Sequence, residues 1–301
     1  MEQTKKIWLN GRFIDWQEAK IHILTHTLHY GGGVFEGIRA YKTRKGPAVF
    51  RLPEHIKRLF YSASALEMEI PFSKQELEKA VLETVKVNEV EECYIRPIVF
   101  FGYGKMGLNP KGCPVQVAIA VWPWGAYLGG KEAVRVKISK YKRIDPRSTV
   151  ADAKITGHYV NSILASLEAQ KTGFDEALLL DGNGYIAEGP GENIFIIKDK
   201  NIFTPPKGAI LPGITRDSVI TIAKDLGFRV EEKNLTVEEL KSADEAFFSG
   251  TAVEICPIAQ IDQCLIGNGM PGEITQKIKE IYQKIVQGEE ERYLNWLSFV
   301  E

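Results

Sequence analysis

The sequence predicts a two-domain protein with a smaller N-terminal α+β domain and a larger, β-rich C-terminal α/β domain. Its 301 residues are about twice the ~150 residues of a typical domain. Strand-like and helix-like patterns occur in both halves of the chain. Between them, Trp122–Gly130 combines a proline and glycines with large aromatic residues, which interrupts regular structure. We therefore expect domains at residues 1–121 and 133–301, joined by an interdomain loop at residues 122–132.

The first domain opens with the strongest short hairpin signal in the chain. Asn10-Gly11 lies between two short apolar runs and predicts a tight turn between strands. Apolar residues at helical spacing predict a helix over 53–68. A second helix follows Ser73, which forms a capping box with Glu76. Further strands are expected at Tyr94–Phe101 and Val115–Val121.

The second domain alternates strands with helices. Helical patterns cover Val160–Gln170 and Thr215–Leu226, and Gly227 follows the latter as the C′ residue that ends a helix. The expected strands are Val134–Ser139, Glu176–Leu180, Asn193–Ile197 and Glu245–Phe248.

Composition excludes several classes of protein. Lys+Arg 38 against Asp+Glu 39 leaves a formal charge of -1, so no basic surplus is present to bind a nucleic-acid backbone. With 44% hydrophobic and 26% charged residues, the chain has the composition of a folded globular protein. The four cysteines form no C-x-x-C pair, and no stretch approaches the ~18 apolar residues of a membrane span. We expect a cytoplasmic protein.

One lysine is a candidate nucleophile. Lys154 lies among small residues just before an apolar helical run. Burial lowers the pKa of an ammonium group, and this lets an amine form a Schiff base with a carbonyl. Most lysines are solvated surface charges, so this interpretation depends on other motifs.

Two segments are candidate anion sites. Leu211–Asp217 is a Pro-Gly loop that leads into a helix, where backbone N–H groups and the helix dipole favour an anion. Ser249–Ala252 offers hydroxyl and backbone donors after a strand. An ordinary helix start and a simple turn are the alternatives.

Asp181–Asn193 admits two interpretations. Asp181, Asn183 and Glu192 occupy positions one, three and twelve of an EF-hand loop. Tyr185 and Ile186 do not suit positions five and six, so a hairpin turn explains Asp181–Gly184 better. Glu188 then follows the hairpin, where its carboxylate can face a ligand.

The histidines at the N-terminus do not predict a metal site. His22, His26 and His29 have spacings of four and three, but no acidic residue accompanies them and glycines 31–33 break the helix that would align them. The segment Gly31–Gly37 is no dinucleotide-binding fingerprint either. We expect no metal.

Taken in order, the motifs resemble those of the branched-chain-amino-acid aminotransferases, which belong to the fold-type IV (D-amino-acid-aminotransferase-like) pyridoxal-phosphate enzymes. The resemblance covers essentially the whole chain. The segments that carry it are His29-Tyr-Gly, Val34-Phe-Glu-Gly-Ile-Arg39, Tyr94-Ile-Arg96-Pro, Pro123–Gly129, Glu188-Gly-Pro-Gly-Glu-Asn193, Leu211–Arg216 and Ser249–Ala252.

This resemblance implies pyridoxal 5'-phosphate as cofactor. Lys154 matches the lysine that bonds to the cofactor and moves the substrate proton. Glu188 matches the carboxylate that pairs with the pyridinium nitrogen. Tyr159 matches the tyrosine that hydrogen-bonds the cofactor's phenolic oxygen, and Asn193 matches a neighbour that supports the same face. Phosphate contacts are implied for Arg58, the N–H groups of Ile214 and Thr215, and the hydroxyl of Thr251.

Substrate contacts follow from the same resemblance. The α-carboxylate would meet the N–H groups of Thr251 and Ala252 and the Tyr94 hydroxyl, while Arg96 would receive the distal carboxylate of glutamate. Branched side chains would contact Phe35, Trp124, Tyr127 and Tyr159, with Tyr30 and Leu108 from a neighbouring subunit. A homodimer is then the smallest functional unit, with a hexamer of three dimers as a larger assembly.

The chain departs from many relatives after the lysine, where it has Ile-Thr-Gly-His instead of Ala-Gly-Gly-Asn; the role of His158 stays open. The resemblance predicts reversible amino transfer between L-Leu, L-Ile or L-Val and 2-oxoglutarate by a ping-pong mechanism. A D-amino-acid aminotransferase or a 4-amino-4-deoxychorismate lyase of the same fold is the nearest alternative, and Tyr94-x-Arg96 and the Pro123-Trp-Gly segment favour the branched-chain member. A non-catalytic binding protein is a further alternative, which the presence of both Lys154 and Glu188 disfavours.

Overall fold

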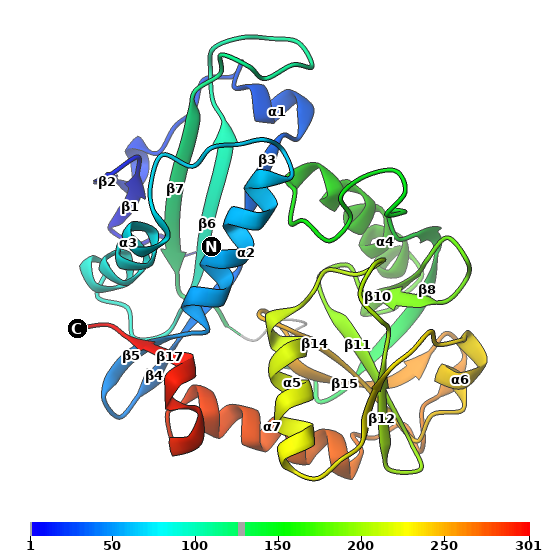
Figure 1. Ribbon diagram of the computed structural model, residues 1–301. Coiled ribbons are helices and arrows are strands. Elements are labelled where there is room, and N and C mark those ends of the chain that lie inside the picture. Colours follow the sequence, from blue (N-terminus) through cyan, green and yellow to red (C-terminus); the bar gives the residue numbers. More distant parts are fainter. Residues whose placement is uncertain (1, 126–129) are drawn as a thin grey trace. The chain divides into compact units, whose positions relative to one another are not determined.

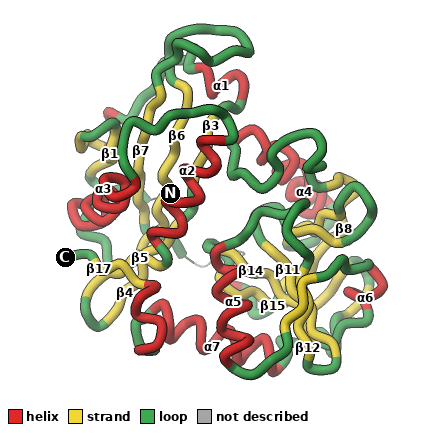
Figure 2. Tube along the Cα trace, viewed as in Figure 1, coloured by secondary structure: helices red, strands yellow, loops and turns green. Residues whose placement is uncertain are grey.

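The computed structural model describes residues 2–125 and 130–301, and the predicted substrate residue Tyr127 lies outside the described residues (Figure 1). The chain divides into two compact units. Unit 1 comprises Met1–Gly125, Ala153–Gly157 and Lys284–Glu301, and unit 2 comprises Ala126–Asp152 and His158–Gln283. Each unit has its own sheet and its own helices (Figure 2).

Unit 1 is built on an 8-stranded sheet with the order β17-β5-β4-β6-β7-β1-β2, and β3 pairs with β6. Its first hairpin confirms the turn expected at Asn10-Gly11: Ile7 pairs with Ile14, and both turn residues have positive φ values of 49° and 90°. The strands are β1 Lys6–Leu9, β2 Arg12–Asp15, β3 Gly33–Phe35, β4 Ile38–Thr43, β5 Gly46–Phe50, β6 Cys93–Phe101, β7 Val115–Trp122 and β17 Leu297–Phe299.

Two long helices cover the core of unit 1. Helix α2 (Leu52–Ser64) starts with a proline in its first turn, and α3 (Lys74–Val87) starts with the expected Ser73–Glu76 capping box. Their apolar faces join side chains of the sheet in one buried cluster. The shorter helical elements are η1 Trp16–Glu18, α1 His26–Tyr30 and η4 Glu291–Trp296.

Unit 2 is built on a 9-stranded sheet with the order β10-β9-β8-β15-β14-β11-β12-β13, and β16 pairs with β15. Strand β10 pairs with β9 and also with β11, which closes a ring of strands. The strands are β8 Val134–Lys142, β9 Glu176–Leu180, β10 Ile186–Glu188, β11 Asn193–Lys198, β12 Asn201–Thr204, β13 Val230–Glu232, β14 Glu245–Gly250, β15 Glu254–Ile261 and β16 Cys264–Leu265.

The helices of unit 2 lie beside this sheet. Helix α4 (Tyr159–Lys171) contacts β8 and β9, and α5 (Ile214–Asp225) contacts β14. Gly227, with a φ of 85°, follows α5 as predicted. The turn between β9 and β10 confirms the hairpin interpretation of Asp181–Gly184, because Leu180 pairs with Ile186. The remaining helices are α6 Val237–Lys241 and α7 Glu273–Val286, and η3 (Thr156–His158) precedes α4.

The division into units differs from the predicted boundaries in two segments. The expected C-terminal domain, residues 133–301, includes residues 153–157 and 284–301, whereas both segments belong to unit 1. The reason is long-range strand pairing: Ile155 bridges Val34, and β17 pairs with β5. Lys154 therefore belongs to the same unit as β3 and α2, although it follows a long excursion through unit 2.

Candidate functional site

One face of α2 carries a buried ionic cluster. The Glu36 side chain is fully buried, and it accepts hydrogen bonds from Nε (2.6 Å) and Nη2 (2.8 Å) of Arg58. Nδ1 of His55 lies 2.7 Å from the same carboxylate. Burial alone would raise the pKa of Glu36, but the charge and hydrogen bonds of Arg58 outweigh it and hold the pKa well below its usual range. Glu36 and Arg58 thus form an ion pair inside unit 1.

The backbone of Lys154 is fixed from two sides. Its N–H donates to the buried Ser62 hydroxyl on α2 (2.9 Å), and its carbonyl accepts from the N–H of Phe35 on β3 (3.2 Å). Lys154 itself is half-buried between the buried residues Ala153 and Ile155. Its Nζ lies 5.0 Å from the centroid of the Phe35 ring. The main chain is anchored, and the amine lies against an aromatic face.

Aromatic rings surround Arg96 in unit 1. Its guanidinium carbon lies 4.8 Å from the centroid of Phe35, 5.5 Å from that of Tyr94 and 5.9 Å from that of Trp122. Trp124 packs on Tyr94 with a centroid distance of 4.9 Å. The structure therefore brings together four residues that are expected to contact substrate, Phe35, Tyr94, Arg96 and Trp124. Trp122, which has no expected role, lies with them.

A glycine permits this arrangement. A Cβ atom at Gly37 would lie 1.9 Å from the Tyr94 hydroxyl oxygen, a distance that no real side chain allows. The residue after Glu36 must therefore be glycine for Tyr94 to keep this position.

Tyr30 and Leu108 lie on the surface of unit 1. Their side chains are 42% and 86% exposed, and the exposed residues Leu28 and Met106 are close to them in sequence. Neither residue belongs to the group around Arg96 within its own chain.

In unit 2, the Glu188 carboxylate is held by donors on both oxygens. Nε of Arg143 donates to Oε1 (2.6 Å), Nδ2 of Asn193 donates to Oε2 (3.0 Å), and the N–H of Leu211 lies within 3.2 Å of both oxygens. Glu188 pairs directly with Asn193 across β10 and β11, which makes the two side chains neighbours. The buried carboxylate thus has donors on both oxygens, one of them the Arg143 guanidinium.

Sequence reasoning missed Arg143. It lies 45 residues before Glu188, and no motif marks it. Its Nη2 also donates to the carbonyl of Ala151 (3.1 Å), so both ends of the guanidinium are held. Only the pairing of β8 with β9 and of β9 with β10 brings Arg143 to the carboxylate.

The start of α5 forms a polar corner with Asn193. A Cβ atom at Gly213, the residue before the helix, would lie 1.9 Å from Oδ1 of Asn193, so only glycine fits. Ile214 and Thr215 are the first residues of α5 and are buried. The N–H groups of a first helical turn have no acceptor within the helix, and they carry the positive end of its dipole. The predicted anion site therefore has the right backbone donors.

Thr251 and Ala252 are half-buried in the turn between β14 and β15. Ser249, on the adjacent strand, pairs with Asn193, and its buried hydroxyl has no hydrogen-bond partner among the described residues. Strand β14 pairs with β11, and β11 pairs with β10, so this turn lies at the same part of the sheet as the Glu188–Asn193 pair.

Tyr159 and His158 stand where η3 meets α4. Both are half-buried, and Tyr159 is the first residue of α4. Nε2 of His158 lies 2.9 Å from Oγ1 of Thr149, which gives the histidine a local contact within unit 2.

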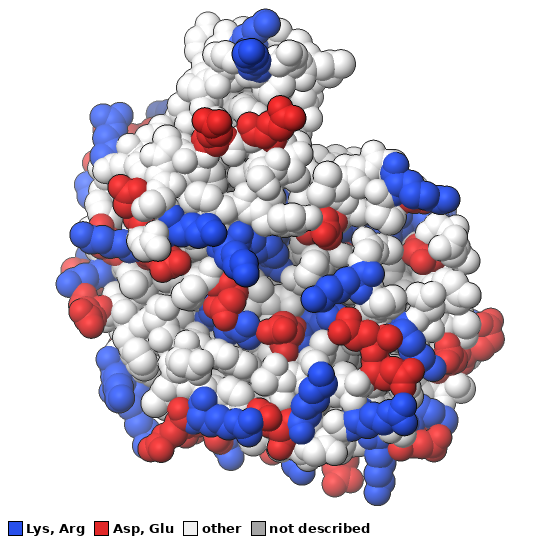
Figure 3. Space-filling model, viewed as in Figure 1, with Lys and Arg blue, Asp and Glu red and all other residues white. Residues whose placement is uncertain are grey.

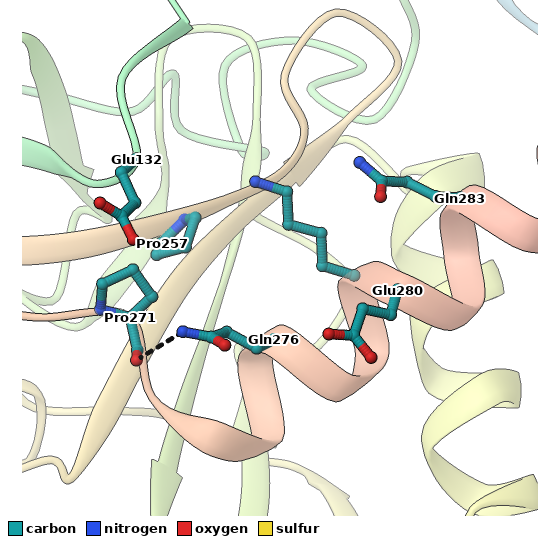
Figure 4. A pocket seen from close by; sticks show the side chains of 7 residues that line it. Glu132, Pro257, Pro271, Gln276, Glu280 and Gln283 are labelled. Carbon is teal, nitrogen blue, oxygen red and sulfur yellow. Dashed lines mark hydrogen bonds between the residues drawn. The ribbon is translucent and has the colours of Figure 1, made fainter.

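A separate cavity in unit 2 contains none of the predicted site residues. Its volume is ≈ 250 Å³, and Figure 4 shows side chains of α7 and β15 around it. Gln276 and Pro271 both line this cavity, and Nε2 of Gln276 donates to the carbonyl of Pro271 (3.2 Å). The lining residues are Glu132, Pro257, Pro271, Gln276, Lys279, Glu280 and Gln283.

Charges of both signs are mixed over the face drawn in Figure 3, in agreement with the balanced composition. Within residues 2–125 and 130–301, no three His, Cys, Asp or Glu side chains are grouped as metal ligands. No helix of the described chain is long and apolar enough to cross a membrane.

Comparison with known proteins assigns the fold and family. The family model for amino-transferase class IV matches residues 33–261, and the chain belongs to this family. Its fold is accordingly that of the class IV aminotransferases, which use pyridoxal phosphate.

Similar proteins that match nearly the whole chain are named branched-chain-amino-acid aminotransferases. The branched-chain-amino-acid aminotransferase of Pseudomonas aeruginosa is 47% identical, with 98% of this chain and 97% of the relative covered. That of Escherichia coli is 43% identical, with 99% of both covered. Among solved structures, the T.th. branched-chain amino acid aminotransferase complexed with N-(5'-phosphopyridoxyl)-L-glutamate matches with a TM-score of 0.97 and 47% identity, and both chains are covered completely.

The residues of each unit fit this cofactor. Unit 2 supplies a buried carboxylate, which suits a protonated ring nitrogen, and a helix start with backbone donors, which suits a phosphate. Unit 1 supplies a lysine with an anchored backbone and an arginine fixed by a buried carboxylate.

Proposed function

We propose that this chain is a branched-chain-amino-acid aminotransferase that moves the amino group reversibly between L-Leu, L-Ile or L-Val and 2-oxoglutarate. The observation that carries the proposal is Arg96 among the rings of Phe35, Tyr94 and Trp122. Aromatic rings suit a branched apolar side chain, and the guanidinium suits the distal carboxylate of glutamate. Relatives with this name, 42–47% identical over nearly their full lengths, support it.

Pyridoxal phosphate, when bound, supplies a ring that withdraws electrons from the substrate Cα. Lys154 would hold the cofactor through Nζ, and the same amine would take up or return the proton at the substrate Cα. Ser62 and the N–H of Phe35 orient the lysine backbone for this task. Glu188 would face the cofactor's ring nitrogen and favour its protonated form, and Arg143 and Asn193 orient the carboxylate by donating to its two oxygens.

The phosphate and the phenolic oxygen have their own donors in this proposal. Arg58, the N–H groups of Ile214 and Thr215, and the Thr251 hydroxyl would bind the phosphate. Tyr159 would donate its hydroxyl to the cofactor's phenolic oxygen. Asn193, through its bond to the Leu211 carbonyl (3.0 Å), orients the loop that leads into α5.

Substrates are oriented at both ends. The Tyr94 hydroxyl and the N–H groups of Thr251 and Ala252 bind the α-carboxylate. Arg96 binds a distal carboxylate, and the residues that contact an apolar side chain are Phe35, Trp124, Tyr127 and Tyr159, with Tyr30 and Leu108 contributed by a second subunit.

A homodimer is the smallest unit that this proposal needs. Tyr30 and Leu108 are exposed in the single chain, although the proposed roles require them to contact substrate. Helix α4 adds a second exposed apolar stripe, of Val160, Ile163, Leu164 and Leu167, at helical spacing. We further propose that three dimers form a hexamer, and that the enzyme acts in the cytoplasm in branched-chain amino-acid biosynthesis.

Borohydride trapping tests the chemistry. We expect the purified protein with pyridoxal phosphate to absorb visible light and, after reduction, to carry the label on Lys154 in peptide maps. Lys154→Ala should abolish both the label and transamination, whereas Lys79→Ala, at an exposed position of α3, should change neither. A protein that binds no chromophore would be a binding protein without this chemistry.

A substrate panel tests the specificity. With 2-oxoglutarate as acceptor, L-leucine should react faster than D-alanine. The opposite order would identify a D-amino-acid aminotransferase, and release of pyruvate from 4-amino-4-deoxychorismate would identify the lyase.

A further inference from the structure

Strand register places Arg96 between aromatic neighbours on both sides. On one side, Trp122 of β7 pairs with Tyr94, and the small Ala120 pairs with Arg96 itself. On the other side, Phe35 of β3 pairs with Ile98. Tyr94, Arg96 and Ile98 point to the same face of β6 because they are two residues apart. Trp122 and Phe35 are therefore the diagonal neighbours of Arg96, within reach of a long side chain.

Arg96, which is half-buried, differs from the least exposed arginines in its partners. Within residues 2–125 and 130–301 it forms no ion pair, and its buried Nε, like those of Arg39 and Arg216, has no hydrogen-bond partner. In contrast, arginines whose side chains are 3% to 12% exposed each pair with a glutamate: Arg39, Arg51, Arg58, Arg143 and Arg216. The Arg96 guanidinium instead makes cation–π contacts with aromatic rings.

Ring faces and a carboxylate contact different parts of a guanidinium. An aromatic face attracts the cation through its quadrupole and needs none of the N–H groups in the guanidinium plane. A carboxylate binds those N–H groups, including Nε. The rings can thus stabilise the cation when no anion is near, and still leave its donors to a carboxylate that arrives.

We propose that Trp122 is a specificity-determining residue: together with Phe35 and Tyr94, its ring stabilises the Arg96 cation while an apolar side chain occupies the pocket. This inference rests on the proposed function. A dicarboxylate brings its own counter-charge to Arg96, whereas a branched apolar side chain brings none. Loss of one ring should therefore weaken the binding of apolar ligands more than that of dicarboxylates.

Two unreactive acids separate these cases. The dissociation constants of 4-methylpentanoate, which is apolar, and glutarate, which is a dicarboxylate, are measured on the holoenzyme from the change in its visible spectrum. In Trp122→Leu, the ratio of the two constants should shift about three- to tenfold in favour of glutarate. In Trp122→Phe, which keeps a ring, most of the wild-type ratio should return.

Matched variants separate this role from a structural one. Trp8→Leu removes a buried tryptophan that packs on Phe72 and is not among the rings around Arg96, so the ratio should stay at its wild-type value. Should Trp122→Leu not fold, Phe35→Leu should shift the ratio in the same direction. An equal loss for both acids, or a shift towards 4-methylpentanoate, would overturn the proposal.

The outcome also distinguishes the inference from the proposed function. If wild-type protein transaminates L-leucine and the variants keep the wild-type ratio, only the role of Trp122 fails. If wild-type protein transaminates neither L-leucine nor L-glutamate, the proposed function itself fails.

Discussion

Glu36 in unit 1 and Glu176 in unit 2 are both buried carboxylic acids, with 0% and 2% exposure. Their pKa values are nevertheless shifted in opposite directions. Glu36 has Arg58 and His55 as side-chain partners, and its pKa lies well below the usual range. Glu176, the first residue of β9, accepts a hydrogen bond from the N–H of Ala177 (2.9 Å). Burial raises the pKa of Glu176 to about 7, and that one bond offsets only part of the effect.

The difference shows that a cation, rather than the degree of burial, decides whether an interior carboxylate stays charged. The buried thiols of Cys93 and Cys256 follow the pattern of Glu176, because burial raises the pKa of each to about 12. Glu36 keeps its charge where the fold supplies Arg58, and Glu188 has the same kind of partner in Arg143. Both of these carboxylates belong to the groups that we propose to serve the cofactor.

Removing the cation from Glu36 should have the largest effect. Arg58→Met should lower the free energy of unfolding by about 3–5 kcal/mol at neutral pH, because it leaves a buried charge without its main partner. Urea unfolding of the apoprotein measures this change. The double variant E36Q/R58M should recover most of the loss, since neither charge then remains.

The pH dependence of this variant follows from the sign of the shift. A carboxylate whose pKa is depressed by folding contributes stability above its unfolded pKa and loses it as the pH falls towards the folded value. Without Arg58, burial should raise the folded-state pKa of Glu36, so Glu36 of the variant takes up a proton as the pH falls while wild-type Glu36 stays charged. The deficit of Arg58→Met should therefore shrink between about pH 7 and pH 4. A deficit that stayed constant over this range would mean that the arginine acts by packing alone.

Glu176→Gln should have the next largest effect, with the opposite sign. The folded state favours the protonated acid, so wild-type protein loses stability as the pH rises from the unfolded pKa towards about 7. Glutamine carries no charge and can still accept from the N–H of Ala177. We expect the variant to be more stable than wild type by about 3 kcal/mol near pH 8 and nearly equal near pH 4.

Thermal and urea unfolding at these two pH values check the prediction. Equal stability of the variant and wild type near pH 8 would show that Glu176 keeps its charge in the folded protein, and it would remove the contrast with Glu36.

Ser62→Ala should have the smallest effect, because the bond it breaks is neutral. The N–H of Lys154 then loses its acceptor, at a cost of about 1 kcal/mol in the free energy of unfolding. Ser64→Ala, an exposed position of the same helix whose hydroxyl bonds the Tyr61 carbonyl, is the control and should cost less. An effect of Ser62→Ala as large as that of Arg58→Met would show that charge is not what distinguishes this cluster.

Much of the fold and part of the site were predictable because their signals are local. The Asn10-Gly11 turn, the capping box of α3 and the glycine after α5 each depend on neighbours within a few residues. The turn at Asp181–Gly184 is of the same kind. Motifs also named Lys154 and Glu188, because each stands in a short characteristic segment.

The amino-acid sequence alone thus determined the elements, the family resemblance and most of the candidate residues. Tertiary structure alone decided that residues 153–157 and 284–301 join unit 1, that Arg143 meets Glu188, and that Trp122 faces Arg96. The physical reason is that these contacts depend on strand register between distant segments. A hydrogen-bonded ladder fixes which side chains are neighbours, and local propensity carries no information about it.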